Sequence, residues 1–470
     1  MSPDWPNASS PDSRRAGAPK RGAGTAAATF RPCPQLIERR VDDRHLGLAA
    51  VGAGGSLTTS ALLIVTAATC YNAVLAIVNA HGVPIGIASV AITEALILTA
   101  AGVMIVKSGR RPLDSLGFLL LALFLVDALI VSIASGTPYV TMARNGTIIA
   151  LFLMLGARVD AATLKRCFLL CAILVFAVLL LELLAVKAYA GFFAPSLYFE
   201  RTRGVAPFEL DELGLFRNAL SFSGRFSISN LSDHRTASLF LEQVSLANFS
   251  TVLVIYLAAM WQRLNRGPKL FYIALILLIL LTNNSRTGLF IALIAPLVYW
   301  LAPRLNRFAP LAIMPGVLIA ATIVAISLPI SYEDTFSGRV GLAMRALAAA
   351  DLPTMLGSSA PLAIQFPDSG YAFLLYSMSL AGLVAFWLMV SLILVTSGAS
   401  QRRCALLIGL YIFCNLLIGA TAVFTIKVAS LLWLLVGFLR REGMESPAEL
   451  VPESPDAPFK RFRFTDSRAA

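Results

Sequence analysis

Charged side chains are scarce in this sequence, and their scarcity excludes most classes of soluble protein. They make up 14% of the 470 residues, whereas hydrophobic residues reach 57%. An ordinary soluble domain carries about 25% charged residues. A soluble fold of this length could not bury so much Leu, Ala, Val and Ile. Several stretches exceed the roughly 18 apolar residues that a membrane-spanning helix needs, so the composition predicts an all-α, polytopic integral membrane protein.

Histidine and cysteine are also rare, which argues against metal and disulfide chemistry. The three histidines are His45, His81 and His234, and no Cys/His spacing indicates zinc. None of the six cysteines falls in a predicted outer segment, so no disulfide framework is expected; they are Cys33, Cys70, Cys167, Cys171, Cys404 and Cys414. No metal or cofactor is therefore expected. The net charge of +12 would suggest nucleic acid in a soluble protein, but cytoplasmic loops account for it here, so we expect no nucleic-acid partner.

The hydrophobic runs predict about twelve transmembrane helices within a membrane domain covering residues 46–441. The weakest assignments are the short seventh and eighth spans, which flank a polar turn at 281–286. Merging these two spans would reverse the orientation of everything that follows them. The predicted spans are 57–79, 84–106, 116–134, 139–157, 166–190, 239–260, 269–282, 286–302, 308–330, 371–396, 404–420 and 422–439.

The distribution of basic residues predicts that both termini are cytoplasmic. With the N-terminus inside, most of the 38 Lys and Arg residues fall in inner segments, and every short inner loop is basic. Residues 1–45 and 442–470 are expected to be disordered cytoplasmic tails, because they are rich in Ala, Pro, Ser and Arg. The first tail holds no apolar run of the kind that a signal peptide requires.

Two long outer segments, about 191–238 and 331–370, are the expected location of function, because long loops in compact domains are usually functional. Arginines collect there against the usual charge rule, and planar guanidinium groups favour phosphate. The alternative is that these arginines are solvated and balanced by nearby acids. Helical spacing predicts short helices at 208–216, where the acids would form a solvated face, and at 337–347.

Ionisable residues inside predicted spans are functional candidates, because each is costly in a bilayer. We expect Asp127 and Arg144 to pair with each other, and we leave the roles of Glu94 and Glu182 open. Glu242 and Lys427 lie toward the outer ends of their spans.

Four short segments resemble the motifs of bacterial O-antigen ligases and polysaccharide polymerases. The first begins His234-Arg235 and contains Phe-Leu-Glu242, although Gln243 replaces the proline of the family motif. The second is an Asn-Ser-Arg-Thr-Gly turn within residues 281–288. The third is the Ser-Gly-Arg motif at 337–339, and the fourth is the segment at 367–371 that enters the next span. The order of the motifs matches the family, and together they cover about 230–395. Ligases carry histidine where Asp368 stands here, which favours a polymerase of the Wzy type.

The resemblance implies a substrate, a site and partners. The substrate would be an oligosaccharide repeat unit on undecaprenyl pyrophosphate, polymerised at the periplasmic face of the bacterial inner membrane in exopolysaccharide or O-antigen synthesis. Arg235, Arg286 and Arg339 would hold the pyrophosphate, and the catalytic base would be Asp368, Glu242 or His234, in that order. Membrane lipids would surround the protein, and a chain-length regulator and export proteins are candidate partners.

Three other functions stay open on sequence alone. A twelve-span transporter or lipid-linked oligosaccharide flippase is the main alternative, although the two halves of the chain show no repeat. An O-antigen ligase is the second. A non-catalytic chain-length partner is the third, and it would need a larger periplasmic domain than segments of this length provide.

Overall fold

The computed structural model describes residues 47–206, 213–219, 231–327, 336–366, 368–394, 398–419 and 422–445, and these residues form helices, turns and loops without a strand. Within them, eight helices are long and apolar enough to cross a membrane. The all-α fold is therefore confirmed for the described residues, and its long apolar helices are those expected of a polytopic membrane protein. Five of them are α1 (Gly47–Ala80), α2 (Ile87–Lys107), α3 (Asp114–Ser135), α5 (Ala161–Leu184) and α9 (Arg266–Asn283). The other three are α8 (Gln243–Met260), α10 (Arg286–Leu301) and α11 (Ile313–Ser327), each extended by an adjoining 3-10 turn to span Gln243–Arg263, Arg286–Arg304 and Ala309–Ser327.

The other four predicted spans also coincide with helices, but these are shorter or less apolar. They are α4 (Thr141–Gly156), the pair α14 (Gly370–Ser377) and α15 (Leu380–Leu392), α16 (Ala399–Asn415) and α17 (Ile426–Glu445). The count of twelve spans and their orientation stay predictions. The tail expected at 1–45 lies outside the described residues. The second tail was placed too early, because α17 continues through 442–445 before the described residues end.

The helix breaks follow local polar contacts that sequence periodicity does not reveal. The span expected at 371–396 is divided at Ser379, whose Oγ accepts a hydrogen bond from Gly382 N and donates one to Asp127 Oδ1. The span expected from residue 239 begins at Gln243, after Leu241 adopts a left-handed conformation with φ of 60°. The predicted turn between the seventh and eighth spans is confirmed, since α9 and α10 are separated by Asn284 and Ser285.

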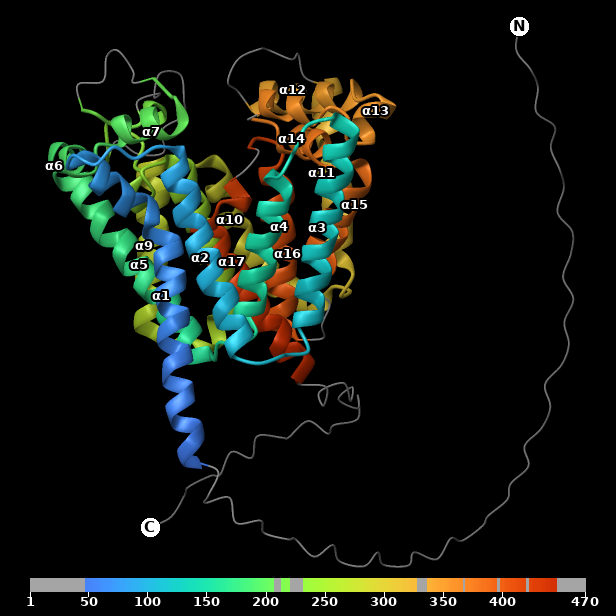
Figure 1. The fold of residues 1–470 in the computed structure, drawn as a ribbon. Helices are drawn as coiled ribbons and strands as arrows, with labels where there is room; N and C mark the ends of the chain where they lie inside the picture. The colour runs from blue at the N-terminus through green and yellow to red at the C-terminus, as the bar shows by residue number, and fades with distance from the viewer. Residues whose placement is uncertain are drawn as a thin grey trace, which may run out of the picture. The chain divides into compact units, whose positions relative to one another are not determined.

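The helices of both long connecting segments lie at one end of the bundle, which we call the loop end (Figure 1). The first carries α6 (Val186–Phe193), α7 (Pro195–Arg203), η2 (Arg217–Ala219) and η3 (Ser238–Phe240). The second carries α12 (Phe336–Ala348), α13 (Leu352–Met355) and η7 (Ala360–Gln365), so the helix predicted at 337–347 is confirmed. The helix predicted at 208–216 lies mostly outside the described residues; in its described part, Leu215 and Phe216 are buried in a loop.

The opposite end, which we call the tail end, is held by buried and surface ion pairs. Arg158 bonds both carboxylate oxygens of Asp114, at 2.6 and 2.8 Å, and three backbone carbonyls, which joins the ends of α2, α3 and α4. Arg263 pairs with Glu442 of α17 at 2.6 Å. These contacts satisfy the arginines and backbone carbonyls where the helices end.

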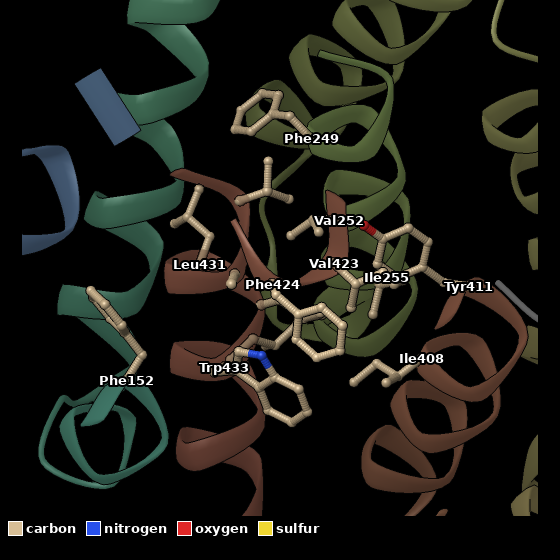
Figure 2. Close-up of a cluster of buried hydrophobic side chains, with 14 of the residues drawn as sticks. Phe152, Phe249, Val252, Ile255, Ile408, Tyr411, Val423, Phe424, Leu431 and Trp433 are labelled. Carbon is tan, nitrogen blue, oxygen red and sulfur yellow. The ribbon is translucent and has the colours of Figure 1, made fainter. Parts of the chain in front are cut away.

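The centre of the bundle is apolar and closely packed. Figure 2 shows aromatic and aliphatic side chains meeting between α4, α8, α16 and α17, among them Phe152, Phe249, Tyr411 and Trp433, all fully buried. α4 and α17 approach so closely that glycine is required at the crossing. A Cβ on Gly437 would lie 2.0 Å from the carbonyl oxygen of Leu153. Small residues commonly allow such backbone contact in membrane proteins.

We expect Gly437→Ala to destabilise the protein, because the new methyl group forces α17 away from α4. Overpacking of this kind costs about 1–3 kcal/mol, measurable as a lower thermal unfolding midpoint in detergent. Gly102→Ala in α2 is the matched control, since its Cβ would meet no atom within 4 Å. Helix propensity makes the control neutral or slightly stabilising. Equal midpoints for both variants would contradict the close crossing.

Candidate functional site

Glu242 lies at the centre of a charged cluster at the loop end. It precedes the first residue of α8, and its carboxylate faces cations from two other elements. Arg203, the last residue of α7, donates from Nη1 to Oε1 at 2.8 Å and from Nη2 to Oε2 at 3.3 Å. Lys427 Nζ of α17 and Ser245 Oγ both donate to Oε2 at 2.9 Å. One carboxylate therefore ties α7, α8 and α17 together.

Lys427 depends on this carboxylate more than Arg203 does. Its side chain is 2% exposed, whereas that of Arg203 is 40% exposed and also stacks over the ring of Phe199 at 4.6 Å. A buried ammonium ion without a partner costs several kcal/mol. Glu242 is consequently required to keep Lys427 charged inside the bundle, and its contacts leave it poorly suited to accept a proton from a substrate.

A second ion pair lies beside the first. Arg144 of α4 binds Glu94 of α2 through Nε at 2.8 Å and through Nη2, and Tyr71 of α1 donates to the same carboxylate at 2.6 Å. Tyr198 of α7 donates a hydrogen bond to Asn72, the residue after Tyr71, at 2.9 Å, so the helix that carries Arg203 is bonded to α1 beside the second pair. The two pairs together hold three cations and two carboxylates, which leaves an excess of positive charge.

The predicted pairing of Asp127 with Arg144 is wrong. Asp127 instead accepts hydrogen bonds from the backbone N and the Oγ of Ser379, at 3.3 and 2.8 Å, and so holds the break between α14 and α15. The two residues lie on adjacent helices of similar hydrophobicity. Their rotation about the helix axes decides which partner each one meets, and the sequence does not specify that rotation.

Two of the predicted phosphate-binding arginines converge on the turn between α9 and α10. Arg235 donates from Nε to the carbonyl oxygen of Asn283 at 3.0 Å, and Arg286 is the first residue of α10. Asn283 in turn donates from Nδ2 to the carbonyl oxygens of Thr236 and Gln243, at 2.6 and 2.9 Å. Arg286 is exposed at the N-terminus of a 16-residue helix, where backbone N–H groups favour an anion.

His234 and Glu182 contact the chain on either side of Arg235. Glu182 is buried at the end of α5, and its carboxylate accepts hydrogen bonds from the backbone N of Ala237 and of Ser238. His234 is also buried, with Nε2 3.3 Å from Glu182 Oε1. These hydrogen bonds fix the chain that leads from Arg235 into α8. Glu182 therefore has a structural role. It also gives His234 a structural contact within the protein.

Arg339 and Asp368 meet in the second long segment. Arg339 of α12 donates from Nη1 to the carbonyl oxygen of Ile418 at 2.9 Å, and the same atom lies 3.7 Å from Asp368 Oδ1. Asp368 is 56% exposed and immediately precedes Ser369, the N-cap of α14. Of the three base candidates, Asp368 is thus the one whose carboxylate is open to solvent.

The structure thus places all six predicted site residues at the loop end, but in separate groups. Arg235 and Arg286 share the α9–α10 turn, and Arg339 is beside Asp368. Glu242 and His234 each face other partners. No motif or spacing in the sequence distinguishes Arg203 from the other loop arginines. Its pairing with Glu242 follows from the position of α7, which the sequence did not predict.

The described residues contain no group of three His, Cys, Asp or Glu side chains that could hold a metal ion. What the loop end offers instead is fixed positive charge. Guanidinium groups lie at the start of α10, on α12 and at the end of α7, and they could bind phosphate or carboxylate groups. Comparisons with protein-family models, with curated proteins and with solved structures found no match to this chain.

We expect Glu242→Gln to destabilise the protein by about 3–5 kcal/mol, because it leaves the buried Lys427 without a counter-charge. The measurement is thermal unfolding of the purified protein in detergent. Glu442→Gln is the matched control, since it breaks the more exposed pair with Arg263 and should cost at most about 1 kcal/mol.

The double variant Glu242→Gln/Lys427→Met tests the physical reason for this loss. Removing both charges should recover much of the stability, because no unpaired charge then stays buried. If Glu242→Gln unfolded at the same temperature as Glu442→Gln, the contact would not be a stabilising ion pair.

Proposed function

We propose that the protein is a glycosyltransferase that polymerises oligosaccharide repeat units carried on undecaprenyl pyrophosphate. The reaction would take place at the loop end, which would face the periplasm of a bacterial inner membrane. The motif resemblance suggests this chemistry, and the loop end supplies what it needs: fixed cations close to the ends of apolar helices. A lipid-linked pyrophosphate presents its charges at that depth while its tail stays in the bilayer.

The observation that carries the proposal is the hydrogen bond from Arg235 to Asn283. It brings together Arg235 and Arg286, which are distant in sequence, at the N-terminus of α10. Two guanidinium groups and a helix N-terminus together favour a doubly charged phosphate group. They would stabilise the charge that develops on the departing pyrophosphate, which is the usual role of such preorganised donors.

The chemical step requires a base but no further activation. A hydroxyl of the acceptor sugar attacks the anomeric carbon of the donor, and the bond from that carbon to the pyrophosphate oxygen breaks. The hydroxyl proton passes to a carboxylate, and the electron pair leaves with undecaprenyl pyrophosphate. A single displacement inverts the anomeric configuration. Asp368 suits the base role best, because Glu242 is held by two cations and His234 is buried against Glu182.

Complementation of a deletion strain tests the function. Wild type should restore surface polymer, whereas Arg235→Ala and Arg286→Ala at matched membrane levels should not. Loss of one transition-state donor typically costs about 10²–10³ in rate. Arg304→Ala is the control, because this exposed arginine follows α10 toward the tail end; it should complement fully.

The lipid-linked intermediates distinguish the alternatives. Single repeat units that accumulate on the outer face of the deletion strain support a polymerase. Repeat units that accumulate on the cytoplasmic face would identify a flippase instead. Polymer that forms normally but is not joined to the lipid A core would identify a ligase, and unchanged polymer would reject the proposal.

Asp368→Asn should lower the rate of polymer formation by about 10²–10⁴, the range for losing a general base. Its membrane level should stay normal, because the side chain is exposed. Asp368→Glu should keep part of the activity. Glu200→Gln, an exposed acid on α7, is the charge-matched control and should be fully active. An active Asp368→Asn enzyme, measured with lipid-linked repeat units in membranes, would remove Asp368 from the mechanism.

A further inference from the structure

The segment 352–364, between α12 and α14, exposes large aliphatic side chains without a protein partner. Leu352 is 68% exposed, Leu356 59% and Ile364 82%, and Leu362 is also exposed. Leu352 and Leu356 are four residues apart and share one helical face. No Asp, Glu, Lys or Arg occurs in this segment. An exposed patch of this kind usually marks a surface that binds something apolar.

Many polar groups of the segment are bonded within it, which favours an apolar environment. Asp351, just before it, caps α13 by accepting a hydrogen bond from Thr354 N at 3.0 Å, and the hydroxyls of Thr354 and Ser359 bond each other at 2.8 Å. The backbone N–H groups of Met355, Leu356, Ser358, Leu362 and Phe366 all donate to carbonyl oxygens within residues 351–363. This pairing lowers the cost of placing the segment against lipid acyl chains.

The segment packs against the side of α3, close to the C-terminal end of that helix. A Cβ on Gly357 would lie 2.8 Å from Cγ2 of Val131, so only glycine allows the approach, and its φ of +93° also favours glycine. Val131 lies four residues, or about 6 Å, before the last residue of α3. The 22 residues of α3 span about 33 Å, close to the thickness of a hydrocarbon core of about 30 Å. A bilayer centred on α3 would therefore place Gly357 near the edge of that core.

The helix against which the segment packs also exposes large aliphatic side chains. Leu129, Ile130 and Ile133 of α3 are themselves exposed, as expected for a helix that faces lipid. We propose that residues 352–364 are embedded in the bilayer interface at the loop end, with the side chains of Leu352, Leu356, Leu362 and Ile364 in contact with lipid acyl chains. The inference does not depend on the proposed enzymatic activity.

Site-directed fluorescence in phosphatidylcholine vesicles tests this placement. The environment-sensitive dye NBD is attached to Leu356→Cys and Ile364→Cys in the full chain. Arg217→Cys is the control, because this residue is exposed at the same end of the molecule on η2. Wild type treated with the dye supplies the blank, since its five described cysteines are free and buried or half-buried.

Lipids brominated on the acyl chain should quench the dye at residues 356 and 364 at least twofold more than at 217. Iodide in the aqueous phase should show the reverse order. Equal iodide quenching at all three positions would place the segment in water and overturn the proposal. Protection from both quenchers would also overturn it, because a second copy or another protein would then cover the patch. Leu362→Cys provides a third position should either variant fail to give monodisperse protein.

Discussion

The carboxylate of Glu242 is the contact on which the loop end depends. It neutralises Lys427 inside the bundle and Arg203 at the end of α7. Without this carboxylate, the two nearby cations would repel each other strongly in a medium of low dielectric. Because Glu242 also precedes α8, its position fixes the start of a helix that is almost wholly buried. The residues that lead into α8, including Arg235, are in turn held by Glu182 and by the turn after α9. The cation-rich surface is thus supported by two acids, the buried Glu182 and the half-buried Glu242.

Hydrophobic runs were sufficient to predict where helices form, because a bilayer imposes one dominant rule on long apolar segments. They were not sufficient to predict where helices break. Ser379 interrupts a continuous apolar run because its hydroxyl meets Asp127, 252 residues away in sequence. Helix α17 continues past its predicted end, and Glu442 within that extension meets Arg263. Both deviations arise from polar contacts between distant residues, and neither leaves a local signal in the sequence.

In the candidate site, too, local features could be predicted from the sequence, whereas contacts between distant residues could not. The polar turn before Arg286 could be predicted because Asn, Asn and Ser between two apolar runs favour a turn and a new N-cap. Arg339 and Asp368 fall in the same predicted outer segment, so their proximity agrees with the sequence. The partners of Arg144 and Glu242 could not be predicted, because they depend on how each helix is rotated and on where α7 packs. Arg203 resembled its neighbours Arg201 and Arg217 in sequence, and only its tertiary contact sets it apart.

The inferred position of residues 352–364 in the bilayer interface bears on the proposed chemistry. Phe366 follows η7, and the centroid of its ring lies 4.7 Å from that of Tyr376 in α14. Asp368 lies between these two packed residues in the sequence. A segment held at the edge of the hydrocarbon core would therefore fix the height of Asp368 above it. The pyrophosphate of a polyprenyl donor is confined to the same height by its tail. Arg235 and Arg286 lie where α9 ends and α10 begins. The proposed base and the proposed phosphate-binding arginines, placed by the same boundary, would need no mobile domain to bring them to a lipid-linked substrate.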